Sequence, residues 1–141
     1  MTGISAIRNE LRRRVVAASG VDFSTQFVAN NEIENPDGQP VWLSESVDGG
    51  THSRLTNMRG RLPDLRIQYD LYTKAGVGMD AADEKVDAIL AEFDEDGSDV
   101  DRLEIAANGA TAVIVSIKHL SGADRNWRRD TILFTVSVVS G

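Results

Sequence analysis

The sequence lacks cysteine altogether and is poor in proline, aromatic residues and long apolar runs, with three prolines and eight aromatics among 141 residues. Without cysteine there are no disulfides and no thiolate metal ligands, so the redox compartment stays undecided. No run approaches the ~18–20 apolar residues of a membrane span, and no signal peptide is recognisable. We therefore expect one soluble domain over residues 1–141, made in the cytoplasm, with no membrane partner.

The net charge of −7 is unevenly distributed along the chain. Residues 80–104 hold eleven acidic and two basic side chains, a net charge of −9, so the remaining residues carry about +2. Basic residues cluster at 12–14, 54–66 and 125–129. Opposite charges on one small domain favour head-to-tail association of identical subunits. For any single cluster, a solvated surface is the simpler interpretation.

Residues 62–93 form the centre of the predicted fold, because a strand, a glycine turn and a helix follow one another there. Residues 65–72 alternate in polarity, which is typical of a strand with one buried and one wet face. The apolar set is Leu65, Ile67, Tyr69 and Leu71, and the polar set is Arg66, Gln68 and Asp70. Gly76 and Gly78 interrupt the strand, and Asp80 occupies an N-cap position. The helix that follows, as far as Phe93, has an apolar stripe and an acidic opposite face.

The remaining segments read as elements that complete this core. Residues 4–18 are periodic as in an amphipathic helix, which Gly20 closes. Residues 21–30 and 41–47 predict a hairpin, and residues 100–107, 110–120 and 127–139 predict three further strands, with a turn region at 121–126. The fold class is therefore α+β: a mainly antiparallel sheet with two amphipathic helices packed on one face.

Residues 48–61 differ from the rest because they are irregular and have little to bury. Loops of this length are uncommon in compact domains unless they bind something. We name this segment the arm and expect it to contact a partner through Arg54, Arg59 and Arg61.

One motif resembles a dinucleotide-binding fingerprint. Residues 76–81 fit the pattern G-x-G-x-x-A between a strand and a helix. However, Asp80, Asp83 and Glu84 crowd the place that a pyrophosphate would occupy, and the preceding strand is half polar. A plain strand-to-helix turn is the better interpretation.

The other candidates for chemistry are an acidic loop and two histidines. Residues 92–97 resemble the opening of an EF-hand loop, but Leu103 occupies the position of the bidentate glutamate, which favours a solvated helix end over a weak cation site. His52 and His119 have no companion ligands or nucleophile at recognisable spacing. We therefore expect no catalytic residue, no metal site, no cofactor and no enzymatic activity.

Trp127, Arg128 and Arg129 place an aromatic ring beside two cations, as in some nucleic-acid contacts. A chain with a pI of about 4.7 is a poor free DNA binder, since affinity for phosphate depends on local cation density. We expect these three residues at a sheet edge or a subunit contact.

Three features together resemble the tail terminator (tail completion) proteins of long-tailed bacteriophages and gene transfer agents. They are the opening helix at residues 4–11, the strand at 65–72 running into Gly76-Val77-Gly78, and the helix at 81–93 with its Ala82-Asp83 opening and later Ile89 and Phe93. In outline they cover the whole chain. The last third, with Asn108-Gly109 and Trp127, is less diagnostic of a subfamily.

The resemblance implies a structural virion protein at the head–tail junction. Such proteins form a ring, commonly of six subunits, that caps the head-proximal end of the tail tube. The implied partners are further copies of the chain, the tail tube protein and a head or neck connector, with genome DNA only passing through the channel. Asp83, Asp87 and Glu92 would meet a basic patch of the next subunit or line the channel.

Two alternatives stay open at this point. One is another head–tail joining protein, such as a neck or head-completion factor. The other is a small ligand- or nucleotide-binding domain that uses the Gly76-Val77-Gly78 turn.

Overall fold

In the computed structural model of this chain, the residues described are 3–29, 38–48, 64–77, 79–93, 104–107 and 110–140. They form two helices, each followed along the chain by three strands. In chain order they are α1 (Gly3–Ser19), β1 (Phe27–Val28), β2 (Val41–Asp48), β3 (Asp64–Lys74), α3 (Met79–Glu92), β4 (Glu104–Ala107), β5 (Ala110–Asp124) and β6 (Trp127–Ser140).

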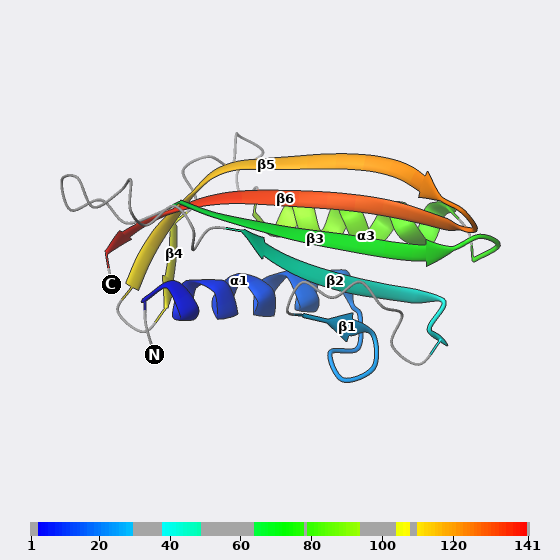
Figure 1. The fold of residues 1–141 in the computed structure, drawn as a ribbon, viewed down its shortest axis with the longest axis horizontal. Helices are drawn as coiled ribbons and strands as arrows, with labels where there is room; N and C mark the ends of the chain where they lie inside the picture. The colour runs from blue at the N-terminus through cyan, green and yellow to red at the C-terminus, as the bar shows by residue number, and fades with distance from the viewer. Residues whose placement is uncertain are drawn as a thin grey trace.

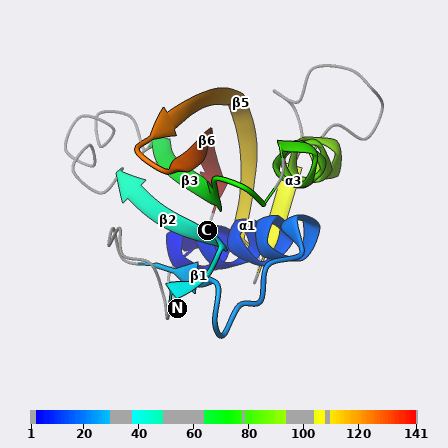
Figure 2. The ribbon, with the colours of Figure 1, turned by 90° about the vertical axis from the view of Figure 1, so that its right-hand side faces the viewer.

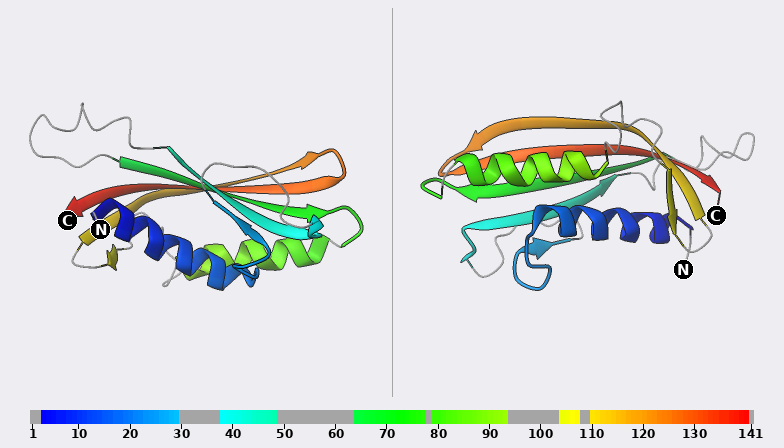
Figure 3. Two further views of the ribbon diagram at one scale, coloured as in Figure 1. Left: turned by 60° about the horizontal axis from the view of Figure 1, so that its bottom comes forward. Right: turned by 180° about the vertical axis from the view of Figure 1, so that it is seen from behind.

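The strands form one sheet in the order β1-β2-β3-β6-β5-β4. All neighbouring strands are antiparallel except β1 and β2. Both helices lie on the same face of the sheet, which curves over them when seen end-on (Figures 1, 2 and 3). The predicted α+β class and the placement of the helices are thereby confirmed.

The core lies between the helices and the facing side of the sheet. The predicted apolar side of β3 is confirmed, because Leu65, Ile67, Tyr69 and Leu71 are all buried. They pack with apolar side chains of the neighbouring strand and of both helices: Ile132, Phe134, Val136, Ile7, Leu11, Val15, Val86, Ile89 and Phe93. Burying each such aliphatic or aromatic side chain stabilises the fold by about 1.5–3 kcal/mol.

Helix α1 ends as its sequence predicts. Gly20 adopts φ 75°, and its N–H donates to the carbonyl of Val16 at 3.1 Å. Lys85 of α3 donates to the carbonyl of Ser19 at 2.8 Å, so a cation from one helix caps the negative end of the other. Helix α3 begins at Met79, which places Asp80 in its first turn rather than at the N-cap.

The predicted hairpin of residues 21–30 and 41–47 is wrong. The first strand is only Phe27–Val28, and it pairs with β2 in parallel, Phe27 opposite Leu43. Polar side chains form a local turn in place of a strand: Asp22 accepts the N–H of Ser24 at 2.9 Å, and Gln26 accepts that of Asp22 at 2.8 Å. The twelve residues 29–40 are long enough for the crossover that a parallel pair needs.

The polar side of β3 is less exposed to solvent than its sequence pattern predicts. Asp70 is 1% exposed, although Arg66 on the same side is exposed. The Asp70 carboxylate accepts hydrogen bonds from Thr131 at 2.6 Å and from Gln68 at 2.9 Å. Neighbouring side chains thus cover it and satisfy it.

The predicted turn region at 121–126 is also wrong in extent. Strand β5 continues to Asp124, and only Arg125 and Asn126 connect it to β6. Ser121, Gly122 and Ala123 stay paired with β6. The two strands therefore form a long hairpin that is closed by a two-residue turn.

Several sequence predictions lie outside the described residues. They concern the arm with Arg54, Arg59, Arg61 and His52, as well as Gly78, the acidic loop at 94–97 and the pair Asn108-Gly109. Strands β4 and β5, on either side of Asn108-Gly109, do pair antiparallel, with Ala107 opposite Ala110.

Candidate functional site

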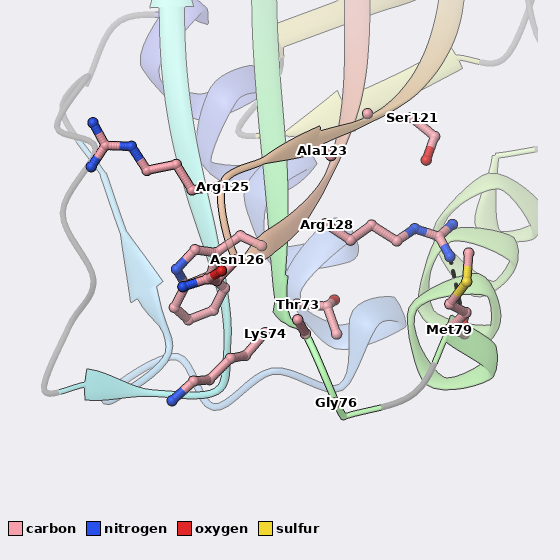
Figure 4. Close-up of a pocket in the computed structure, with 12 residues that line it drawn as sticks. Thr73, Lys74, Gly76, Met79, Ser121, Ala123, Arg125, Asn126 and Arg128 are labelled. Carbon is pink, nitrogen blue, oxygen red and sulfur yellow. Dashed lines mark hydrogen bonds between the residues drawn. The ribbon is translucent and has the colours of Figure 1, made fainter.

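The candidate site is a hollow at one end of the sheet, between the β5–β6 hairpin tip and the turn from β3 into α3 (Figure 4). Its volume is about 590 Å³. The residues that line it include Thr73, Lys74, Met79, Arg125, Trp127 and Arg128. This volume falls within the ~300–1,000 Å³ of ligand pockets, although the hollow is open to solvent.

Two tight turns form this end of the molecule. Arg125, the first residue of the hairpin turn, has φ 59°, a left-handed conformation usually left to glycine or asparagine. Gly76 has φ 98° and lets the chain leave β3. The N–H of Ala75 donates to the carbonyl of Asn126 at 2.7 Å, which ties the two turns together.

An ion network joins the hairpin to the first turn of α3. Arg128 donates to Asp130 through Nε at 3.0 Å and to Asp83 through Nη2 at 2.6 Å. It also donates to the carbonyl of Met79 at 3.3 Å (Figure 4). Hydrogen bonds from Arg128 to Asp83 and Asp130 raise the pKa of the Arg128 guanidinium. The site therefore has a fixed cation whose charge is already compensated.

His119 belongs to the same network. Its Nε2 lies 3.0 Å from Oδ1 of Asp130, a carboxylate with no solvent exposure. In the part of the chain that the structure describes, no group of three or more histidine and acidic side chains is arranged to hold a metal ion.

Thr73 lines the hollow and lacks a partner. Its side chain is 3% exposed, and its Oγ1 finds no hydrogen bond among the described residues. A buried hydroxyl without a partner costs about 1–3 kcal/mol, so Thr73 places an available hydrogen-bonding group at the edge of the hollow.

An aromatic cluster lies on the face of the sheet away from the helices. Trp42 and Tyr72 stack with ring centroids 4.2 Å apart, and Trp127 meets both edge-on at 6.5 Å. Trp127 therefore anchors the tip of the hairpin on this face of the sheet, and it is also among the residues that line the hollow.

The structure places the predicted interface residues in different surroundings. Asp83 and Glu92 form ion pairs within the chain, with Arg128 at 2.6 Å and with Arg14 at 2.9 Å. Arg129 lies on the face of the sheet away from the helices, with its Nε 3.5 Å from Oδ1 of Asp70. The remaining acidic residues of α3 are exposed and have no ion pair among the described residues: Asp80, Glu84 and Asp87.

The structure brings Trp127 and Arg128 to the hollow but not Arg129, Asp87 or Glu92. Sequence reasoning missed Thr73, Lys74 and Arg125 as site residues. A signal for Arg125 existed, since Arg125-Asn126 is a polar pair between two alternating segments and thus a hairpin tip. No sequence signal marks Thr73, because its lack of a partner depends on how distant segments pack.

The topology around Gly76 differs from that of a dinucleotide-binding fold. Both neighbours of β3 are antiparallel to it, whereas that fold needs a parallel strand–helix–strand unit. Among the described residues, no helix is both long and apolar enough to cross a membrane.

The fold and the site define an α+β domain with its helices on one face and an open hollow at the end of a long hairpin. No protein-family model matches the chain, and no curated protein matches it. One similar solved structure, of a protein named only by a sequence identifier, has a TM-score of 0.66 at 18% identity and covers 97% of this chain and 96% of its own. Another is a chain in the virion of a native gene transfer agent particle, with a TM-score of 0.55 at 16% identity, covering 98% of this chain and 97% of its own. These likenesses establish a shared fold over nearly the whole chain.

Proposed function

We propose that this protein is a structural virion protein of a long-tailed phage or gene transfer agent, and that it caps the head-proximal end of the tail tube. The observation that carries the proposal is the shared fold with a chain of a gene transfer agent virion, which extends over 98% of this chain. The strand, glycine turn and helix at residues 64–92 supply the resemblance to tail terminator proteins.

In this proposal the protein acts as a ring of identical subunits, with six the expected number. A closed ring needs two different, complementary surfaces on each subunit. The exposed carboxylates of α3, namely Asp80, Glu84 and Asp87, supply one charged surface. They line the channel, where negative charge keeps DNA from binding as it passes, or they meet a basic patch of the next subunit.

The arm provides the contact with the tail tube or the neighbouring subunit. Reversing the charges of Arg54, Arg59 and Arg61 is expected to abolish binding to purified tail tubes in a co-sedimentation assay. The far-ultraviolet circular dichroism spectrum should stay unchanged, because these arginines are predicted to bury little. Undiminished binding by the triple variant would remove the arm from the contact.

Assembly state is the decisive measurement. Light scattering after size-exclusion chromatography, with negative-stain images of the same fractions, should show a ring with a central channel. A monomer at every concentration up to the millimolar range would overturn the proposal. Co-purification with heads rather than tails would instead identify a neck or head-completion factor.

One observation favours a second candidate, a small ligand-binding domain: the hollow beside the Gly76 turn has the volume of a ligand pocket. A thermal-shift screen with nucleotides and divalent cations tests it, because a ligand that binds the native state raises its melting temperature. A saturable rise with one of these compounds would favour this candidate over the ring.

A further inference from the structure

The exposed charges that lack an ion pair are sorted onto two sides of the molecule. Among the described residues, the exposed cations without an ion pair are Arg66, Lys74, Lys118 and Arg125. In the same part of the chain, the exposed carboxylates without one are Asp22, Asp80, Glu84 and Asp87. Apart from Arg125 in the hairpin turn and Asp22 in the loop after α1, these cations lie on strands and these carboxylates lie on one helix.

The three strand cations lie on the face of the sheet away from the helices. Arg66 and Lys74 alternate with the buried apolar side of β3, so they point the other way. Ile117 of β5 packs against the core, so Lys118, the next residue, also points away from it. We name these three cations the basic face. The side chain of Arg125 extends away from Met79, where α3 begins, and adds a further positive charge at the hairpin tip (Figure 4).

The three carboxylates of α3 form a stripe on the outer side of that helix. Asp80, Glu84 and Asp87 follow one another at four- and three-residue steps, which places them along one side of the helix. The residues of α3 that pack on the core lie on the opposite side. Ala88 and Ala91, which are exposed as well, lie beside the stripe, so its surface combines carboxylates with short side chains. We name Asp80, Glu84 and Asp87 the acidic stripe.

The basic face has the length and the room to receive a helix. Helix α3, with 14 residues, is about 21 Å long, and the eight residues from Arg66 to Lys74 span about 26 Å along β3. The same face carries Leu120, which is 70% exposed. Beside Leu120 lies a hollow of about 370 Å³, and a side chain added at Gly122 there would meet no atom within 4 Å.

We propose that the acidic stripe of one copy docks on the basic face of the next copy. The carboxylates of the stripe pair with the three strand cations, and the short side chains of Ala88 and Ala91 let the helix approach Leu120. The proposal rests on the ring proposed above. It names the subunit contact of that ring and assigns the acidic stripe to this contact rather than to the channel.

A second copy is the occupant because the two surfaces are complementary in charge but lie on opposite sides of the sheet. Both described helices lie on one side, and the basic face is on the other (Figures 2 and 3). One copy therefore cannot join its own two surfaces. A contact between two different surfaces of identical subunits is head-to-tail and can close into a ring. Stripe on stripe, or face on face, would bring like charges together, so the charges also select the orientation of the copies.

Charge reversal of each surface in the full-length protein tests the contact. The stripe variant carries Glu84→Lys and Asp87→Lys, and the face variant carries Lys74→Glu and Lys118→Glu. Asp80 stays in place because its charge favours the first turn of α3. Each variant alone should raise the dissociation constant of the assembly at least about a hundredfold, because like charges then meet. Light scattering and negative-stain images measure assembly, and circular dichroism checks the fold.

Mixing the two variants is the sharper measurement. Each surface of one variant is complementary to the other surface of its partner variant, so alternating copies should form rings, with a dissociation constant within about tenfold of the native value. A fluorescent stripe variant should enter rings with the face variant. It should not enter rings with Arg13→Glu, the control, because Arg13 is an exposed cation on α1 outside both surfaces. The control alone should assemble like the native protein.

The outcomes separate this contact from the proposed function. If the native protein forms rings and the stripe variant alone forms them equally well, the contact is wrong while the ring proposal stands. Failure of the mixture to assemble, with both variants folded, would overturn the contact as well. Binding of a labelled DNA duplex that the face variant loses, with normal assembly of the stripe variant, would make the basic face a nucleic-acid surface instead. If neither the native protein nor the mixture assembles, both proposals fail.

Discussion

Two arginine–carboxylate networks fasten the two helices to the same face of the sheet, and they differ in how far water reaches them. Under α1, Arg12 binds Glu45 at 3.0 and 2.5 Å, and Tyr69 donates to the same carboxylate at 2.8 Å. At α3, Arg128 joins the buried Asp130 to Asp83, whose side chain is 56% exposed.

The difference separates a covered network from one that borders an open hollow. Glu45 is buried, and Arg12 is covered further by the Phe27 ring, 5.5 Å from its guanidinium carbon. Since both the Glu45 carboxylate and the Tyr69 hydroxyl are buried, loss of a partner there leaves a buried polar group unpaired, which is costly. The Arg128 network borders the open hollow, where solvent screens its outer half.

The largest expected effect comes from breaking the network under α1. Glu45→Ala leaves a part-buried guanidinium and a buried hydroxyl without partners, so we expect a loss of about 3–5 kcal/mol in the free energy of unfolding. Urea denaturation followed by circular dichroism measures it. A loss below about 1 kcal/mol would show that the network under α1 is no costlier to break than a solvent-exposed ion pair.

At the α3 network the expected loss is smaller. Asp130→Asn keeps the size of the side chain and leaves Arg128 paired with Asp83, so we expect a loss of about 2 kcal/mol in the same assay. Asp83→Asn should cost less than about 1 kcal/mol, and that cost should disappear in molar salt. A larger loss of unfolding free energy for Asp83→Asn than for Asp130→Asn would contradict the view that Asp130 is the buried partner of Arg128 and Asp83 the exposed one.

Tyr69→Phe removes only the hydroxyl from the α1 network, and we expect a loss of about 1.5 kcal/mol at pH 7. Burial, together with the nearby Glu45 charge, raises the pKa of Tyr69 well above 10. The resulting stability is complete below pH ~10, where unfolded tyrosine ionises, and is lost as the pH rises further toward the folded-state pKa.

The native protein should therefore lose stability above pH 10 by up to about 1.4 kcal/mol per pH unit from this group. Tyr69→Phe should remove that part of the slope, whereas Tyr72→Phe, at the other tyrosine, should retain it. Urea midpoints between pH 8 and 11.5 give both slopes, and identical slopes in the native and Tyr69→Phe proteins would refute the assignment.

The smallest effect is expected where neither partner is buried. Arg13 and Glu10 pair at 2.6 Å on the outer surface of α1. Glu10→Ala should leave the urea midpoint unchanged within error at 150 mM salt, because surface pairs of this kind are screened. A clear shift would mean that exposure does not rank these ion pairs.

The spacing of apolar residues made α1, α3 and the buried side of β3 predictable, because helical periodicity and strand alternation are each set within one segment. The direction of β1 was not predictable in this way. It depends on how distant segments pair, and the local hydrogen bonds of Asp22 and Gln26 shorten the strand.

The buried carboxylates divide into two cases. Glu45 follows Val41 and Leu43 in the apolar register of β2, and Asp130 precedes Ile132 and Phe134 in that of β6. An acidic residue in an apolar register is a readable signal of a buried ion pair. Asp70 gives no such signal, since it lies in the polar register and its main partner, Thr131, is 61 residues away.

The candidate site was only partly predictable for the same reason. Trp127 and Arg128 stood out as an aromatic beside cations, and the structure brings both to the hollow. Thr73 and Lys74 became site residues only because the hairpin tip packs beside the end of β3, a contact between segments about fifty residues apart.

The two strands at the margins of the described sheet are β1, with two residues, and β4, with four. An unpaired strand edge is a template on which a further strand can add. Strand β4 pairs only with Ala110–Val113 of β5, so among the described residues the outer edge of β5 has no strand partner from Ile114 to Asp124. The backbone N–H and C=O groups along that edge therefore offer a further chain a length of sheet on which to pair.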